Sequence, residues 1–208
     1  MNHVAIVDYG MCNLDSVRRA FEELGARATI VDDPAGLERA DRIVLPGVGA
    51  FPDAMRNLHL RGLDDALTKH VLDAGAPFLG ICLGMQLLAT SGHEVAPTPG
   101  LGWFDADVVR LRPDAEGVRV PHIGWNEVDT VAGSGAGALF AGIPPCADFY
   151  FVHSFHVESR RDGDVLATTP YCGSFVSAIA HDNVFAVQFH PEKSQQHGLR
   201  LLRNFLEL

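Results

Sequence analysis

The sequence predicts an α/β fold with a central, mostly parallel sheet. In the first half of the chain, short apolar runs alternate with segments of helical periodicity, which is the pattern of strand–helix–strand units. Between Gly100 and Gln188 the pattern changes to short β-like segments separated by Gly and Pro, which predicts antiparallel strands added to the parallel core. Neither an internal repeat nor a linker interrupts the 208 residues, so we expect a single domain over residues 1–208.

The elements of the first half are expected from apolar runs and helical spacing. Either Asn13 or Asp15 caps a first helix that runs to Leu24, with Gly25 as its stop. A second helix is expected over Gly62–Ala74, because its apolar residues recur at helical spacing. Four apolar runs predict strands: Val4–Val7, Ala28–Val31, Arg42–Leu45 and Pro77–Ile81.

The later elements are expected from the same two periodicities. Leu83–Ala89 is expected to form two turns of a helix, and Phe149–Val157 to form one strand. The β-branched and aromatic residues of Asn183–Phe189 predict another strand. The Gly- and Ala-rich segment Val131–Gly142 is expected to be a surface loop. A final helix is expected over Gln195–Leu206, with a buried stripe formed by Leu199, Leu202, Phe205 and Leu206.

Composition argues against several classes of protein. The formal net charge is −10 and no basic cluster stands out, which argues against a nucleic-acid-binding surface. No apolar run reaches the roughly eighteen residues of a membrane span, and no basic segment precedes the first apolar run as in a signal peptide. The 4 cysteines are scattered, so we expect neither a zinc site nor a disulfide framework. A soluble cytosolic protein is expected.

The segment Gly80-Ile81-Cys82-Leu83-Gly84 carries the strongest chemical signal. It joins a predicted strand to a predicted helix, so Cys82 is expected on a sharp turn where flanking glycines avoid backbone clashes. The amides at the start of the helix point at the sulfur and favour the thiolate. A free cysteine is often only a small buried apolar residue, so the turn by itself does not identify a nucleophile.

A base and an orienting carboxylate follow near the end of the chain. His190 and Glu192 come directly after a predicted strand, and residues two apart in extended backbone project to the same side. Pro191 stiffens the link between them. Cys82, His190 and Glu192 therefore predict a nucleophile, a general base and the group that orients the base.

Two further features bear on the site. Pro46-Gly47-Val48-Gly49 follows a predicted strand and so lies at the carboxyl edge of the sheet, although by itself it is more simply an ordinary glycine turn. Leu83, the residue after the nucleophile, is the natural backbone donor to an oxyanion.

His153 and His156 are three residues apart on a predicted strand and therefore face opposite sides, which argues against a shared metal ion. We expect no metal and no cofactor.

Several motifs together resemble those of class I glutamine amidotransferases. They span nearly the whole chain in the order of that family, with one departure: Cys12 stands where the family pattern usually has glycine. The resemblance implies the flavodoxin-like fold of the family, with helices on both faces of the sheet. The motifs are Asp8-Tyr9-Gly10-Met11-Cys12-Asn13-Leu14, Leu45-Pro46-Gly47-Val48-Gly49-Ala50-Phe51, Gly80-Ile81-Cys82-Leu83-Gly84-Met85-Gln86, Pro121-His122-Ile123-Gly124-Trp125-Asn126, Tyr150-Phe151-Val152-His153-Ser154-Phe155 and Val187-Gln188-Phe189-His190-Pro191-Glu192-Lys193-Ser194.

The resemblance also implies roles for individual residues. The glycine loop would supply an oxyanion amide from Gly47 or Val48, beside that of Leu83. Without the resemblance, Gln86 would be interpreted as a solvated helix residue. A core or surface position would be the default for His122, Trp125, Asn126 and Lys193, which have no local chemical task. The implied substrate contacts are Gly49, Gln86, Ser154 and Phe155. The implied partner-facing residues are Asn13, Trp125, Asn126 and Lys193.

The implied chemistry is hydrolysis of the side-chain amide of glutamine. The Cys82 thiolate attacks the amide, and His190 gives a proton to the departing ammonia. Water activated by His190 then releases glutamate from the thioester. Free ammonia is mostly protonated at neutral pH, and ammonium is no nucleophile, so members of the family pass ammonia directly to a synthase.

Within the family, the motifs are most similar to those of the glutaminase subunits of histidine biosynthesis. Their partner is a (β/α)₈-barrel cyclase that makes imidazole glycerol phosphate and AICAR, so the resemblance implies a heterodimer. Pro46-Gly47-Val48-Gly49, Gly124-Trp125-Asn126 and Glu192-Lys193-Ser194 favour this member over subunits that serve anthranilate, aminodeoxychorismate or pyridoxal phosphate synthesis. A catalytically inactive regulatory subunit is a further alternative, against which the intact triad speaks.

Overall fold

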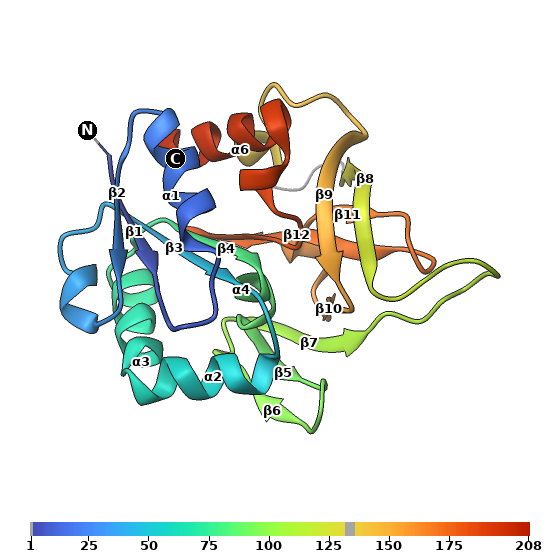
Figure 1. Cartoon of the computed structure of the whole chain (residues 1–208), viewed down its shortest axis with the longest axis horizontal. Coiled ribbons are helices and arrows are strands. Elements are labelled where there is room, and N and C mark those ends of the chain that lie inside the picture. The colour runs from blue at the N-terminus through green and yellow to red at the C-terminus, as the bar shows by residue number, and fades with distance from the viewer. Residues whose placement is uncertain (1, 132–135) are drawn as a thin grey trace.

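The computed structural model describes residues 2–131 and 136–208 (Figure 1). None of the described helices is long and apolar enough to cross a membrane. The helices are α1 (Leu14–Glu23), α2 (Phe51–Leu60), α3 (Leu63–Thr68), α4 (Leu83–Gln86), α5 (Ala136–Leu139) and α6 (Gln195–Glu207), with short 3₁₀ or π turns at Pro34–Leu37, Lys69–Asp73, Asp162–Asp164 and Pro191–Lys193. The strands are β1 (His3–Val7), β2 (Arg27–Val31), β3 (Arg42–Gly47), β4 (Phe78–Cys82), β5 (Ala89–Gly92), β6 (Thr98–Pro99), β7 (Phe104–Arg110), β8 (His122–Thr130), β9 (Ala147–His153), β10 (Phe155–Ser159), β11 (Val165–Thr169), β12 (Phe175–His181) and β13 (Val184–Val187).

The strands form one large mixed sheet with a parallel centre. β2, β1, β3, β4 and β13 run parallel in that order, which is the strand order of flavodoxin-like folds. The sheet continues through the antiparallel strands β12, β10 and β7 and then through β5 and β6. β8 pairs along its length with β9 and briefly with β11. The predicted parallel sheet with added antiparallel strands is confirmed.

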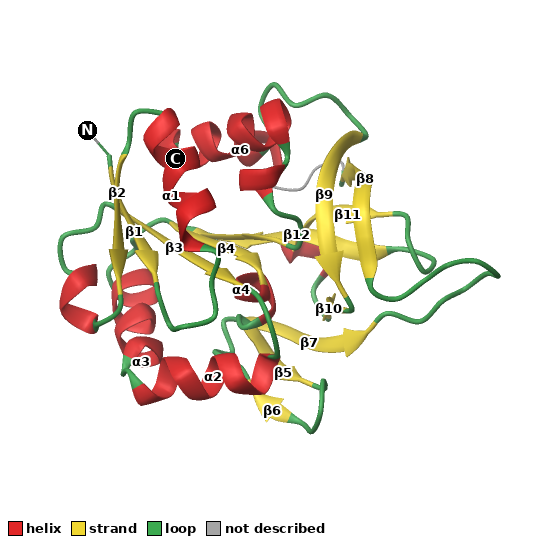
Figure 2. Cartoon of the chain, viewed as in Figure 1, coloured by secondary structure: helices red, strands yellow, loops and turns green. Residues whose placement is uncertain are grey.

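Helices cover both faces of the parallel strands (Figure 2). α1 and α6 lie on one face, and α2 and α3 on the other. Alternate residues of β1 therefore enter two separate cores: Val4 and Ile6 pack in the cluster with α1 and α6, whereas Ala5 and Val7 pack in the cluster with α2 and α3. Because both faces are buried, the central strands are almost continuously apolar, and that is why the sequence reveals them.

The predicted elements of the first half are largely confirmed. The four predicted strands are present, each within two residues of its expected ends. Asn13 occupies the N-cap position of α1, although its side chain makes no capping hydrogen bond. The second predicted helix is α3, which continues into the π turn Lys69–Asp73. The final helix is also confirmed, but Leu201 rather than Leu199 is fully buried in its stripe.

The predicted helix over Leu83–Ala89 is wrong beyond Gln86, because Ala89 already begins β5. Every residue from Leu83 to Ala89 is buried, so no exposed face sets a helical period. The carbonyls of Leu87 and Leu88 instead accept hydrogen bonds from the backbone amides of Leu101, Trp103 and Phe104. Long-range backbone pairing therefore ends the helix.

Two other local predictions also fail. The single strand expected over Phe149–Val157 breaks at Ser154, because β9 pairs with β8 while β10 pairs with β7 and β12. The expected surface loop Val131–Gly142 falls partly on residues 132–135, which lie outside the described residues. In the remainder α5 forms, and Leu139 and Phe140 are buried in the core.

We expect Gly84→Ala to lower the free energy of unfolding by about 2 kcal/mol or more. A Cβ at this position would clash with the backbone carbonyl oxygen of Leu45 in β3, which no side-chain rotation can relieve. Urea denaturation measures the difference. Gly163→Ala is the control, since nothing lies within 4 Å of its Cβ, and it should stay within about 1 kcal/mol of wild type. Equal stability of the two variants would show that α4 does not pack on β3 as described.

Candidate active site

Cys82 lies at the corner between β4 and α4 in a strained backbone conformation. Its φ of 56° and ψ of −110° fall outside the regions that residues other than glycine ordinarily occupy. A Cβ at Gly80 would lie only 2.9 Å from the carbonyl oxygen of Gly84, so this corner excludes larger residues at its flanks. The structure thus has the sharp strand-to-helix turn expected from the sequence.

His190 and Glu192 form a buried pair. Nδ1 of His190 lies 2.8 Å from Oε1 of Glu192, and the exposed fractions of the two side chains are 3% and 1%. Pro191–Lys193 is a 3₁₀ turn, so the expectation of extended backbone from His190 to Glu192 is wrong. The two groups meet because the turn is tight, and Ser194 holds it by donating from Oγ to the carbonyl of His190 at 2.6 Å.

The histidine of this pair is charged at neutral pH. Burial disfavours the charged ring, but Cys82 and Glu192 outweigh that effect and raise the pKa of His190 to about 10. Nδ1 is held by Glu192, while Nε2 is buried and has no hydrogen-bond partner among the described residues. Nε2 is therefore the ring atom available to Cys82 and to a bound substrate.

A cavity of about 370 Å³ opens beside Cys82, within the range of sites for small molecules. All the substrate contacts implied by the family resemblance line it: Gly49, Gln86, Ser154 and Phe155. Val48 and Leu83 line it as well. The remaining walls come from residues that the sequence did not single out as substrate contacts: Glu94, Arg110, Val152 and His153.

The side chain of Gln86 is not solvated. Its Nε2 donates to the carbonyl of Phe155 and to Oε1 of Gln188, both at 2.9 Å. Gln188 is fully buried, and its own Nε2 lies 3.6 Å from Sγ of Cys82. Sequence reasoning missed Gln188, and the one available indication was a glutamine at the end of an otherwise apolar strand.

The predicted oxyanion donors are only partly in place. Leu83 begins α4 and lines the cavity. The backbone amide of Val48, however, donates to the carbonyl of Met11 at 2.9 Å, so it does not point into the cavity in this conformation. Gly47 is buried at the end of β3, directly opposite Cys82 in the strand register.

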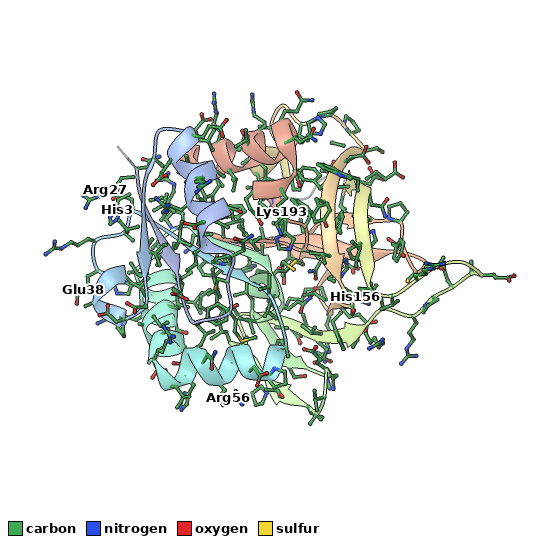
Figure 3. The ribbon with its side chains drawn as sticks, viewed as in Figure 1. His3, Arg27, Glu38, Arg56, His156 and Lys193 are labelled. Carbon is green, nitrogen blue, oxygen red and sulfur yellow. The ribbon has the colours of Figure 1, made fainter. Side chains whose placement is uncertain are left out.

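The residues implied to face a partner are mostly accessible. Trp125 is 48% exposed on β8, and Asn13 is exposed at the start of α1. Lys193 lies beside β9 (Figure 3), and its Nζ is 5.9 Å from the ring centre of Tyr150. Asn126 is half-buried. His122, from the same motif, is instead buried at 4% exposure and cannot face a partner.

The site holds no cluster suited to a metal. His153 and His156 belong to different strands, β9 and β10. Among residues 2–131 and 136–208, no group of three or more His, Cys, Asp or Glu side chains is placed to hold a metal ion.

Comparison with known sequences identifies the family. The family model for Glutamine amidotransferase class-I matches residues 5–208. The chain is 47% identical over 208 residues to the imidazole glycerol phosphate synthase subunit HisH of Moorella thermoacetica. The alignment covers 100% of this chain and 96% of that protein. It is 45% identical over 205 residues to the imidazole glycerol phosphate synthase subunit HisH 1 of Campylobacter jejuni, which covers 99% of this chain and all of that protein.

Solved structures share the fold. A putative GMP synthase subunit from Thermoplasma acidophilum has a TM-score of 0.74 at 25% identity, over 100% of this chain and 93% of that one. PurLQS from Thermotoga maritima has a TM-score of 0.76 at 18% identity, over 99% of this chain and 98% of that one, which is a likeness of fold alone. With a family match over nearly its whole length and full-length relatives at about 45% identity, the chain belongs to the class I glutamine amidotransferases.

Proposed function

We propose that this chain is the glutaminase subunit of imidazole glycerol phosphate synthase. It hydrolyses glutamine to glutamate and ammonia and passes the ammonia to a cyclase subunit in a heterodimer. The observation that carries the proposal is the buried Cys82, His190 and Glu192 constellation beside a cavity of about 370 Å³. The full-length identity of 47% to a relative named as such a subunit supports the choice among amidotransferases.

Cys82 acts as the nucleophile. Its thiolate attacks the side-chain carbonyl carbon of glutamine, and the charged His190 gives its Nε2 proton to the departing ammonia. The glutamyl thioester that remains is attacked by water, from which the now neutral His190 takes a proton, and glutamate leaves as the thiolate is restored. Glu192 keeps Nδ1 protonated and the ring oriented through both steps.

The oxyanion hole requires a change at Val48. Leu83 supplies one amide, and the Val48 amide becomes the second only when it leaves the Met11 carbonyl to which it is now bonded. The glycines on either side of Val48 make rotation of this peptide easy, and Gly49 already has a φ of 103°. We take the present arrangement as the resting state, which the loaded cyclase converts into the active one.

The partner binds at the surface around β8. Ile123 and Trp125 are two residues apart on this strand, so their side chains share a face, and they are 61% and 48% exposed. An exposed apolar face of this kind marks a protein interface. Lys193 borders it, because its Nζ lies over the ring of Tyr150, which packs against Trp125. Asn126 lies on the opposite face of β8, beside His122, and Asn13 lies at the start of α1. Ammonia leaves toward this surface without entering bulk water.

We expect Cys82→Ala to lower glutamine-dependent synthesis by the complex at least about a thousandfold, because the attacking sulfur is lost. Synthesis from added ammonium salt should stay near the wild-type rate, since that chemistry belongs to the cyclase. Both rates are measured with the assembled heterodimer. Glutamate release near the wild-type rate would show that Cys82 is not the nucleophile. Loss of both activities would show that Cys82 matters for assembly instead.

Replacement of Glu192 by Gln should lower the pKa of His190, which is raised in the folded chain from 6.5 to about 10. Because the pKa of His190 is higher in the folded chain than in the unfolded one, protonation of this ring stabilises the fold. The stabilisation is fully present below pH 6.5 and is lost as the pH rises toward 10. The difference in unfolding free energy between wild type and Glu192→Gln should therefore be largest at pH 6 and shrink by pH 10. Glu38→Gln, at an exposed carboxylate, is the control and should show no such trend. A constant difference across this range would contradict the charged pair.

We expect low glutaminase activity in the isolated chain and a rise of about 10²–10³-fold when the cyclase holds its substrate. This is the effect of one oxyanion donor, here the Val48 amide. Glutamate release is measured for the chain alone, for the empty complex and for the loaded complex. Equal rates in all three would establish a constitutive glutaminase and rule out the proposed change at Val48.

A further inference from the structure

A line of buried and partly buried hydrogen bonds runs from Asn126 on β8 to the wall of the cavity. His122 on β8 and His153 on β9 are directly opposite each other in the strand register, and Nδ1 of His122 lies 3.1 Å from Nε2 of His153. Nδ1 of His153 lies 2.9 Å from the carbonyl oxygen of Phe155. At the other end, Nδ2 of Asn126 lies 3.3 Å from Nε2 of His122.

Which atom donates and which accepts in each bond of this line follows from the groups at its two ends, the Phe155 carbonyl and the Asn126 amide. The Phe155 carbonyl can only accept, so His153 carries its proton on Nδ1 and its Nε2 accepts from Nδ1 of His122. Nε2 of His122 is then the acceptor for the amide of Asn126. The orientation of that amide agrees, because its Oδ1 is already occupied by the backbone amide of Glu127 at 2.9 Å.

Both rings must be neutral for the line to hold, and their surroundings keep them so. Burial lowers the pKa of His122 to about 4 and that of His153 to about 3. His122 is stacked between the rings of Tyr171 and Phe151, with centroids 4.0 and 4.9 Å away. A proton added to either ring would set two N–H groups against each other.

The line ends at the wall of the cavity, at a carbonyl that two side chains share. The Phe155 carbonyl that His153 holds also accepts from Nε2 of Gln86 at 2.9 Å. Gln86 in turn reaches Gln188, whose amide lies 3.6 Å from Sγ of Cys82. Phe155 directly follows the break at Ser154 between β9 and β10, and His153 itself lines the cavity.

We propose that His122, which does not touch the cavity, is a positioning residue for glutamine hydrolysis. Through His153 it fixes the Phe155 carbonyl, and with it the amide of Gln86, at the wall of the glutamine pocket. The inference rests on the proposed function, because it takes glutamine as the occupant of this pocket. A shift of β8, which carries Ile123 and Trp125 on its exposed face and Asn126 on its inner face, would reach the pocket through the same bonds.

Two substitutions of His122 separate its hydrogen bonds from its packing. His122→Phe keeps the ring between Tyr171 and Phe151 but removes the donor to His153. His122→Asn removes the ring but keeps an N–H donor, because Nδ2 of asparagine lies where Nδ1 of histidine does. In the loaded heterodimer we expect the KM for glutamine to rise about tenfold in His122→Phe, with a smaller change in kcat. His122→Asn should stay within about threefold of wild type.

His156→Phe is the matched control, since His156, like His122, packs near Phe175 but takes no part in the line. Its KM should be unchanged, and ammonium-dependent synthesis should be unchanged in all three variants. If His122→Asn is impaired while His122→Phe is not, His122 acts by stacking and the proposal fails. It fails equally if both variants raise KM alike or if neither does. A wild-type complex without glutaminase activity would instead overturn the proposed function itself.

The ring protons provide a measurement that does not depend on activity. In ¹⁵N–¹H NMR spectra of the wild-type chain, His122 and His153 should both carry their proton on Nδ1 and remain neutral at pH 6. In His122→Phe, the Nδ1 proton of His153 should exchange faster with water. A proton on Nε2 of His153 in the wild type would reverse the direction of the line and overturn the proposal.

Discussion

The site depends on the close packing of the corner at Cys82 against the neighbouring strand. The backbone of α4 approaches β3 so closely that a Cβ on Gly84 would strike the carbonyl of Leu45. This contact holds Cys82 at a positive φ, a conformation that costs about 1–3 kcal/mol and persists only when its surroundings enforce it. The apolar clusters on both sides of the sheet supply that enforcement. The packing of α4 against β3 therefore fixes the position of the nucleophile.

The parallel register then brings distant segments to the same edge. Gly47 at the end of β3 pairs with Cys82 at the end of β4, and Val187 at the end of β13 pairs with Ile81. His190 follows three residues later, so it reaches the same edge as Cys82 although 108 positions separate them in the chain. Because parallel strands present their carboxyl ends on one side, no additional element is needed to assemble these groups.

Two histidines near Cys82 have pKa values shifted in opposite directions. The pKa of His190 is raised to about 10, whereas that of His153 is lowered to about 3. Both rings are buried, so burial alone does not separate them. His190 has a carboxylate and a sulfur as neighbours, while His153 has a carbonyl oxygen and a neutral His122. One ring is thereby suited to move a proton and the other to hold a carbonyl in place.

The sequence by itself determined the parallel centre of the sheet, the corner at Cys82 and the pairing of His190 with Glu192. Each of these rests on a local pattern: a continuous apolar strand, glycines around one cysteine, or two side chains close in the chain. Only the tertiary structure decided where α4 ends, that the strand breaks at Ser154, and that Gln188 reaches the sulfur. It also decided that His122 is buried against His153 and that the Val48 amide bonds to Met11. These features depend on which distant backbone or side-chain group accepts a hydrogen bond from a given donor. Long-range strand pairing determines that partner, and it produces no periodic pattern in the sequence.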